Sequence, residues 1–298
     1  MRFGPARALI AALATIGATT ATADGPKARF LSHYTWEAGA DGFGGLSGLE
    51  MSDDGMALTA ISDRGLILTA DLTREGDRIT GVTLTGMDEI ATRAAGRLPD
   101  DTQDAEGLAS APDGTIFISY EGEPMIARLP PTPEAAGTLP LHPELQAVQH
   151  NSGMEALAID GEGRLFTLPE RSGEYGRPFP VWMFTAPRWQ MVARLERHPD
   201  YLPVGADFGP DGWLYILERG FNGIGFRSRL RRIEPLKGGI QAGEVLMSSA
   251  ILAHDNLEGI SVWRDGEGRI RLSMISDDNF RRLQRTEIVE YVIDKPLQ

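Results

Sequence analysis

The sequence lacks several features that would point to common protein classes. None of its 298 residues is cysteine, so the chain can form neither a disulfide, nor a thiolate metal site, nor a cysteine nucleophile. After the N-terminal segment, no stretch reaches the roughly 18 apolar residues that a membrane-spanning helix needs. We therefore expect no membrane span. With 29 basic and 42 acidic residues, positive charge is in the minority, and the formal net charge is −13.

This acidic balance limits the partners that the surface can attract. A surface of this sign repels nucleic acid and anionic lipid, whereas it attracts cations. We therefore expect no nucleic-acid partner. The expected ligand is a small ester or phosphate, and the expected oligomeric state is a monomer. An anionic substrate would need local arginines or a bridging metal.

Common catalytic motifs are also missing. The sequence has no G-x-S-x-G elbow, no phosphate-binding loop and no dinucleotide fingerprint. Its five histidines show no H-E-x-x-H pair or other tight metal-binding spacing. A serine nucleophile is therefore not supported by any motif.

The N-terminus has the pattern of a secretory signal peptide. Arg2 and Arg7 are basic, residues 8–18 are apolar, and Ala21-Thr-Ala23 matches a small-x-small cleavage site. We expect a signal peptide over residues 1–23 and a periplasmic or secreted protein over residues 24–298. A short buried helix is the alternative interpretation of the same stretch.

One sequence unit recurs about every 50 residues along the chain. In each copy a strand of small and apolar residues is followed by an Asp-Gly or Glu-Gly turn and then by a second strand. The five copies begin with residues 46–55, 104–114, 153–163, 204–212 and 256–266. This spacing is typical of a four-stranded propeller blade.

The repeat predicts an all-β fold, a β-propeller of five four-stranded blades in a single domain. Each unit is followed by candidates for two further strands, except that the fifth has only residues 287–293 left before the C-terminus. An unassigned strand at residues 29–36 could pair with this last blade and close the ring, which would remove an open edge. Six blades, or a β-sandwich with accidental similarity between segments, are the alternatives.

Acidic residues recur at matching positions of these units. The first strands begin near Glu106, Glu155 and Glu258, and the second strands end with Asp63, Glu121, Glu170, Glu218 and Asp277. Since the start of strand one and the end of strand two share one face of a propeller, we expect these acids to converge at one channel mouth. Basic and polar residues accompany them: Arg64, Arg171, Arg219, His150, Asn151 and Asn256.

Converging carboxylates need compensation. Like charges in a partly desolvated funnel are unfavourable unless a cation, an arginine or a raised pKa relieves them. A hard cation such as Ca²⁺ takes oxygen ligands of this kind. The alternative is an acid–arginine girdle between blades that has only a structural role. We favour a ligand site for the cluster as a whole, because concave mouths are where ligands bind.

The same residues carry a resemblance to a known family. GGLSGL at 44–49, ISDRG at 61–65, DAEGL at 104–108, NSGMEAL at 151–157, LPER at 168–171, NLEGI at 256–260 and ISDDN at 275–279 resemble the phytase-like ("esterase-like activity of phytase") proteins of bacteria. The resemblance runs over about residues 40–293. It implies an exported propeller with ester or phosphomonoester hydrolysis, and a site where acids hold calcium and the metal binds phosphate.

Three functions are consistent with these patterns. The first is a metal-assisted ester or phosphoester hydrolase. In it Glu106, Glu155 and Glu258 are ligands or the general base, the five strand-end acids are metal ligands, and the arginines and polar residues bind substrate. The second is a non-catalytic propeller that binds a ligand or a protein. The third is a glycoside hydrolase, which would need a carboxylate pair at a defined separation.

Overall fold

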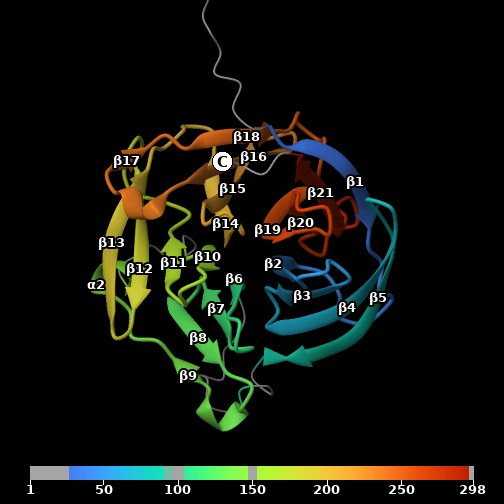
Figure 1. Ribbon diagram of the computed structural model, residues 1–298, viewed down its shortest axis with the longest axis horizontal. Coiled ribbons are helices and arrows are strands. Elements are labelled where there is room, and N and C mark those ends of the chain that lie inside the picture. Colours follow the sequence, from blue (N-terminus) through green and yellow to red (C-terminus); the bar gives the residue numbers. More distant parts are fainter. Residues whose placement is uncertain (1–26, 91–93, 95–103, 147–152, 295–298) are drawn as a thin grey trace, which may run out of the picture.

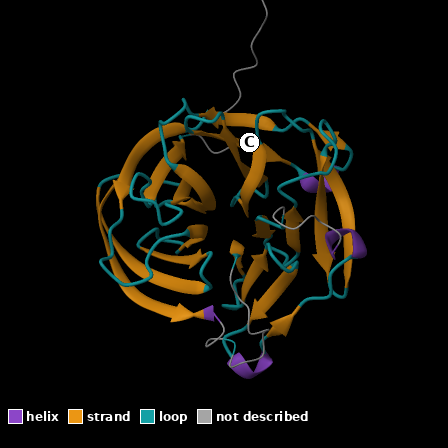
Figure 2. Ribbon diagram, turned by 180° about the vertical axis from the view of Figure 1, so that it is seen from behind, coloured by secondary structure: helices purple, strands orange, loops and turns teal. Residues whose placement is uncertain are grey.

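The described chain consists almost wholly of β-strands. The structure is a computed structural model, and it describes residues 27–90, 94, 104–146 and 153–294. Within these residues there are 21 strands, one short helix, α2 (Pro143–Gln146), and two 3₁₀ turns, at Pro133–Ala135 and Pro235–Lys237. Figure 2, the view from behind, shows strands in every part of the ring and helices only at its periphery.

Five sheets surround a central axis as the blades of a propeller (Figure 1). Blade 1 contains β2 (Leu46–Met51), β3 (Ala57–Ser62), β4 (Leu66–Glu75) and β5 (Arg78–Glu89). Blade 2 contains β6 (Ala105–Ser110), β7 (Ile116–Tyr120), β8 (Met125–Leu129) and β9 (Gly137–Thr138). Blade 3 contains β10 (Ala156–Ile159), β11 (Leu165–Leu168), β12 (Phe179–Thr185) and β13 (Arg188–Leu195).

The other two blades complete the ring. Blade 4 contains β14 (Leu202–Phe208), β15 (Leu214–Phe221), β16 (Phe226–Ile233) and β18 (Glu244–Ser248). Blade 5 contains β19 (Asn256–Arg264), β20 (Ile270–Asp277), β21 (Glu287–Ile293) and β1 (Arg29–Thr35). The two-residue strand β17 (Ile240–Gln241) adds a parallel fifth strand to β13 at the outer edge of blade 3.

The predicted five-bladed propeller is confirmed. The alternatives of six blades and of a β-sandwich are wrong. Strand β1 pairs antiparallel with β21, so the N-terminal strand supplies the outermost strand of the last blade as expected. This pairing joins the two ends of the described chain in one sheet and closes the ring of blades. The predicted signal peptide over residues 1–23 lies outside the described residues.

The same tight turn joins the first two strands of every blade. Its last residue is a glycine whose N–H bonds to the carbonyl three residues earlier, as in the turn from Ser52 to Gly55. Each of these glycines has φ between 68° and 82°, a conformation that side-chain-bearing residues rarely adopt. They are Gly55, Gly114, Gly163, Gly212 and Gly268. The repeated glycine is therefore required by the turn that reverses each inner strand.

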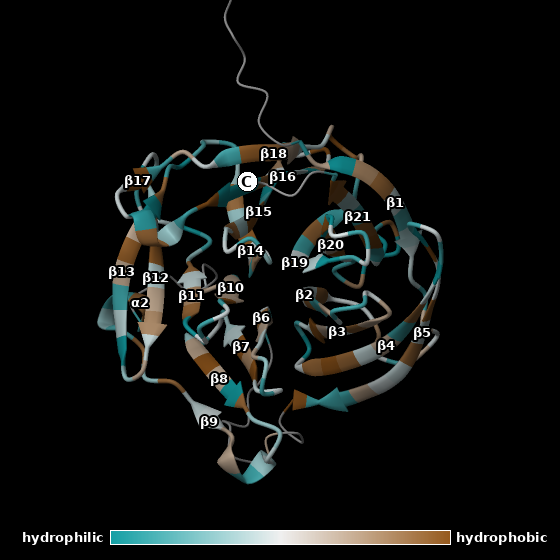
Figure 3. Ribbon diagram, in the orientation of Figure 1, coloured by the Kyte–Doolittle hydropathy of each residue, from teal (hydrophilic) through white to brown (hydrophobic). Residues whose placement is uncertain are grey.

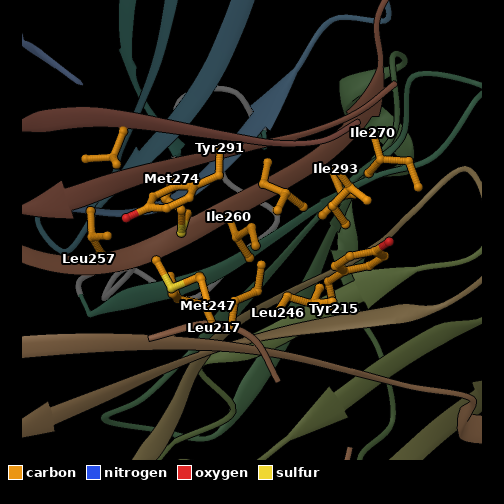
Figure 4. Close-up of a cluster of buried hydrophobic side chains, with 14 of the residues drawn as sticks. Tyr215, Leu217, Leu246, Met247, Leu257, Ile260, Ile270, Met274, Tyr291 and Ile293 are labelled. Carbon is orange, nitrogen blue, oxygen red and sulfur yellow. The ribbon is translucent and has the colours of Figure 1, made fainter. Parts of the chain in front are cut away.

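Hydrophobic cores lie between neighbouring blades. Figure 4 shows the cluster between blades 4 and 5, where Leu217 and Met247 meet Ile260 and Met274. Figure 3 shows hydrophobic segments within the strands of each blade. Because every blade buries both faces against its neighbours, no blade has a complete core alone. Within the described residues, no helix is long and apolar enough to cross a membrane.

Candidate functional site

Three glutamates lie at or just before the start of inner strands, and two of them, Glu106 and Glu258, occupy irregular positions there. The inner strands of blades 1, 2, 4 and 5 each carry one extra residue relative to the partner strand. Such β-bulges turn a side chain away from the regular alternation. The extra residues are Ser47, Glu106, Val204 and Glu258, and Glu155 takes the matching place just before β10.

A second set of residues follows from the pairing register of the next strand. In each blade, the inner-strand residue that follows the bulge, or follows Glu155 in blade 3, pairs with a residue of the second strand. The second-strand residue two positions later lies at the channel end. This position holds Asp63, Glu121, Glu170, Arg219 and Asp277 in blades 1 to 5. We call these five residues, with Glu106, Glu155 and Glu258, the mouth.

The fourth blade departs from the expected pattern. The sequence suggested that every blade places an acid at the end of its second strand, with Glu218 in blade 4. The register places Arg219 there instead, and Glu218 one residue earlier. Since successive side chains of a strand point to opposite faces, Glu218 points into the blade interior. There its carboxylate accepts bonds from Arg229 Nε at 2.7 Å and Arg231 Nε at 2.8 Å.

The channel beneath the mouth is almost filled. Glycines on the inner strands let neighbouring strands approach closely, and a Cβ at Gly107 would lie 2.7 Å from the carbonyl oxygen of Glu155. The cavity that remains among these strands measures about 10 Å³. That is at the lower limit for one water molecule. A ligand would therefore bind at the mouth and not pass through the channel.

Arg219 is the cation at the centre of the mouth. Its guanidinium forms an ion pair with Glu258 and reaches Glu170 Oε1 at 3.2 Å and Asn256 Oδ1 at 3.1 Å. The amide of Asn256 in turn donates to Glu258 Oε1 at 2.9 Å and to Asp277 Oδ2 at 3.3 Å. Burial alone lowers the pKa of Arg219, but the carboxylates around it outweigh burial and raise that pKa. Arg219 thus stays charged and links blades 3, 4 and 5.

Three of the carboxylates form a compact group of oxygen donors. One oxygen each of Glu121, Glu155 and Glu170 can be chosen so that all three lie within 4.8 Å of one another. Glu155 and Glu170 are buried, and Glu121 is half-buried. Glu170 also pairs with Arg171 Nε at 3.1 Å, a contact at the exposed rim. Among the described residues, this is the group whose geometry suits a metal ion.

Carboxyl groups of the mouth are hard to ionise. Burial, with the nearby Asp277 adding to it, raises the pKa of Glu258 to about 8 against the opposing effect of Arg219. Burial also raises the pKa of Asp277 to about 6. For Glu106 and Glu155, burial and then neighbouring glutamates raise the pKa well above the usual range. Without a bound cation, the mouth therefore holds protons at neutral pH.

One loop beside the mouth was not predicted as part of the site. Asp278 Oδ1 accepts the N–H groups of Gly45 and Phe280, each at 3.0 Å, and Phe280 has φ of 50°, which is unusual for a bulky residue. The guanidinium of Arg64 lies 3.3 Å from the centroid of the Phe280 ring. The sequence signal for this loop was the adjacent acids of ISDDN, which cannot show that an aromatic ring would hold Arg64.

The structure therefore brings most of the predicted site residues together. Seven of the eight predicted acids lie at the mouth: Asp63, Glu106, Glu121, Glu155, Glu170, Glu258 and Asp277. Arg171, Arg219 and Asn256 contact these acids, whereas Arg64 packs beside them on Phe280. Glu218 is separated from them inside the blade. His150 and Asn151 lie outside the described residues.

The fold and the mouth define a five-bladed β-propeller with a carboxylate-rich site at one end of its channel. The sequence model of the phytase-like family, described as "esterase-like activity of phytase", matches residues 41–280. The chain belongs to this family, and the resemblance seen in its motifs is confirmed. Comparison with curated proteins gave no match.

Solved structures with a similar chain path share little sequence with this protein. The PQQ-bound aldose sugar dehydrogenase of Streptomyces coelicolor is 16% identical, with a TM-score of 0.46, over 90% of this chain and 100% of that one. The gluconolactonase of Xanthomonas campestris is 14% identical, with a TM-score of 0.44, over 83% of this chain and 72% of that one. Virginiamycin B lyase of Staphylococcus aureus is 12% identical, with a TM-score of 0.43, over 89% of each chain.

Proposed function

We propose that this protein is an exported hydrolase of phosphate or carboxylate esters, that its active site is the mouth, and that Glu121, Glu155 and Glu170 hold a divalent cation such as Ca²⁺. The observation that carries the proposal is the convergence of these three carboxylates in a mouth where acids outnumber arginines. Membership of the phytase-like family supports the reaction class. Export rests on the N-terminal pattern of residues 1–23.

The three glutamates fit a hard cation. They offer only oxygen ligands, which Ca²⁺ and Mg²⁺ prefer, and they come from two neighbouring blades that are fixed by β-pairing. When bound, such a cation would polarise the ester oxygen and make water more acidic. A bound cation would relieve the repulsion between these carboxylates. The negative charge of the group therefore favours cation binding.

The remaining mouth residues can hold substrate and exchange protons. Glu258 has a pKa near 8 and Asp277 one near 6, and such carboxyl groups can donate or accept a proton at neutral pH. Arg219 is already engaged by carboxylates and fixes their orientation. Arg171 is about half-exposed at the rim, which suits it to contact a substrate anion.

Metal content and hydrolysis, measured together, test the proposal. The protein from residue 24 onward is assayed with 4-nitrophenyl phosphate and 4-nitrophenyl acetate, with added Ca²⁺ and after EDTA treatment. We expect hydrolysis that depends on the cation and that falls at least about 100-fold in Glu155→Gln and Glu170→Gln. The control is Glu123→Gln, which removes an exposed acid two residues from Glu121 and should change neither quantity.

Two results would contradict the proposal in different ways. Unchanged metal content and unchanged hydrolysis in both mouth variants would remove the site from the mouth. Binding of Ca²⁺ by wild type, lost in both variants, without turnover of either ester would favour the non-catalytic binding propeller. In that case ligands would be sought by their effect on the melting temperature.

A further inference from the structure

A second hollow lies beside the mouth, between the loops of blades 4 and 5. Its volume is about 650 Å³, within the range of small-molecule pockets. The loop after β15, the segment before β19 and the loop between β20 and β21 form its walls. The residues of this hollow used below are Phe221, Ile224, Leu252, Arg281, Arg282 and Leu283.

The walls of the hollow expose apolar side chains to an unusual degree. Leu283 is 96% exposed, Ile224 80%, Leu252 66% and Phe221 62%. Single exposed apolar residues need no explanation, but four that surround one hollow indicate a binding surface. The ring of Phe221 packs on the ring of Phe226, with 4.9 Å between the two centroids, and this contact holds Phe221 in place at the base of its loop.

The hollow is also basic, although the chain as a whole is acidic. Neither Arg281 nor Arg282 forms an ion pair or hydrogen bond with another described side chain, while Arg285 pairs with Glu287 Oε1 at 2.9 Å. The acid in the hollow is Asp255, whose carboxylate accepts bonds from the backbone N–H of Asn256 at 3.0 Å and of Arg285 at 2.9 Å. Two arginines whose side chains have no charged partner among the described residues therefore line the same hollow as the apolar residues, on a chain of formal charge −13.

The hollow adjoins the mouth along the chain. Asp255, in the wall of the hollow, directly precedes Asn256, which contacts Arg219 and Glu258. Phe221 follows Arg219 by two residues on β15, so the two side chains share one face of the strand about 7 Å apart. The hollow therefore lies near the carboxylates of the mouth.

We propose that this hollow binds the apolar part of an amphipathic organic anion, such as an aryl or acyl ester that carries a phosphate, sulfonate or carboxylate group. The apolar part packs against Phe221, Ile224, Leu252 and Leu283, and Arg281 and Arg282 pair with the anionic group. As a statement of substrate class it rests on the proposed function. The binding of such an anion can be tested without any hydrolysis.

A fluorescent probe of this chemistry tests the hollow directly. We would titrate the protein with 8-anilinonaphthalene-1-sulfonate, an aromatic sulfonate. We expect one saturable site whose affinity falls about tenfold in Leu283→Asp and in Ile224→Asp, because each change removes apolar contact area. It should fall about threefold to tenfold in the double variant Arg281→Gln/Arg282→Gln. N-phenyl-1-naphthylamine has the same rings without the sulfonate, and its affinity should not respond to the arginine changes.

Matched variants on other surfaces serve as controls. Leu236→Asp changes an exposed leucine at the turns on the opposite end of the molecule, and Arg188→Gln changes an exposed arginine of blade 3. Both should bind the probe as wild type does. All the substituted residues are exposed, so melting temperatures should stay within a few degrees of wild type.

The outcomes separate the hollow from the proposed function. Wild-type probe affinity in the Leu283 and Ile224 variants would overturn the inference, whatever the hydrolysis assays show. Self-association that Leu283→Asp abolishes, without an effect on the probe, would also overturn it in favour of a contact between copies. Loss of probe binding in these variants, retained binding in Glu155→Gln and no hydrolysis by wild type would uphold the hollow and overturn only the proposed function.

Discussion

Two regions of this propeller use the same residue types in opposite proportions. Inside blade 4, the carboxylate of Glu218 is fully buried between Arg229 and Arg231, and Arg231 also donates to the carbonyl oxygen of Glu196 in blade 3 at 3.0 Å. Between blades 5 and 1, Glu290 is likewise held by Arg74 and Arg271, each at 2.8 Å. One acid faces two arginines in both places.

At the mouth the proportion is reversed. Seven acids lie near three arginines: Arg219 at the centre, Arg171 at the rim and Arg64 beside Asp63. Fully paired acids fasten blades together, whereas acids in excess over arginine remain able to bind a proton or a cation. Acid–arginine pairs of the kind that the sequence left open as an alternative therefore exist inside and between the blades, and Arg219 adds such pairs at the channel mouth, where acids outnumber arginines.

The largest expected effect concerns the paired region. Glu218→Gln leaves two buried guanidinium groups without their charge partner, so we expect the free energy of unfolding to fall by about 3–5 kcal/mol. Urea unfolding measures this loss. The exposed control Glu123→Gln should stay within about 0.5 kcal/mol of wild type. A loss below about 1 kcal/mol for Glu218→Gln would mean that the paired acid is not a fastening element.

The second prediction concerns pH. Because the pKa of Glu258 is about 8 in the fold and near 4.5 in the unfolded chain, the folded state binds more protons between these values. Stability is therefore highest at the acidic end of this window and is lost as pH rises through it. In EDTA we expect the melting temperature to fall by about 4 °C or more between about pH 5 and pH 8.5.

Glu258→Gln is the matched variant for this pH dependence. It removes the titrating group without changing the shape of the side chain, so the fall in melting temperature over the same range should become smaller. Saturating Ca²⁺ should also flatten the curve, because a bound cation replaces protons among the carboxylates. A melting temperature that rises from about pH 5 to pH 8.5 without Ca²⁺ would contradict the raised pKa values.

A third, smaller effect should have the opposite sign to the first. Glu155→Gln replaces a buried carboxyl group whose raised pKa costs stability at neutral pH, so we expect its melting temperature to rise by about 2–4 °C over wild type in EDTA. The same change should abolish the rise that Ca²⁺ causes in wild type. Differential scanning calorimetry with and without Ca²⁺ measures both effects. A destabilised variant that still responds to Ca²⁺ would show that Glu155 is only a structural acid.

The smallest effect is expected at the rim. Arg171 pairs with Glu170 but its side chain is 54% exposed, and exposed pairs contribute at most about 1 kcal/mol. Arg171→Gln should therefore leave the free energy of unfolding within about 0.5 kcal/mol of wild type while it raises the KM for 4-nitrophenyl phosphate several-fold. An unchanged KM would remove Arg171 from the substrate-binding residues.

Much of the fold could be predicted because each blade repeats the same local pattern. The strand Glu287–Ile293 matches the prediction at both ends. The outermost strand of blade 5 was less accurate: it was expected over residues 29–36 and ends at Thr35. Outer strands pair on one side and carry little periodic signal, so their ends depend on packing against neighbours.

The site was predictable by residue type but not by register. Glu218 and Arg219 are adjacent, and a sequence pattern aligned the wrong one with Glu121 and Glu170. A shift of one residue reverses the face of a strand, and the bulge that sets this shift in blade 4 lies at Val204 on the partner strand. The ring contact between Phe280 and Arg64 likewise joins residues more than 200 positions apart, which no local motif records.

The sequence by itself determined the repeat, the turn glycines, the five blades and the surplus of acids, because these depend on local patterning that every blade repeats. Only the tertiary structure decided which acids are paired and which are not. Charge pairing depends on which side chains of different blades meet and on how far water is excluded around them. Those two properties arise when the ring closes, and they separate the paired interior acid Glu218 from the acids of the mouth, which outnumber the arginines there.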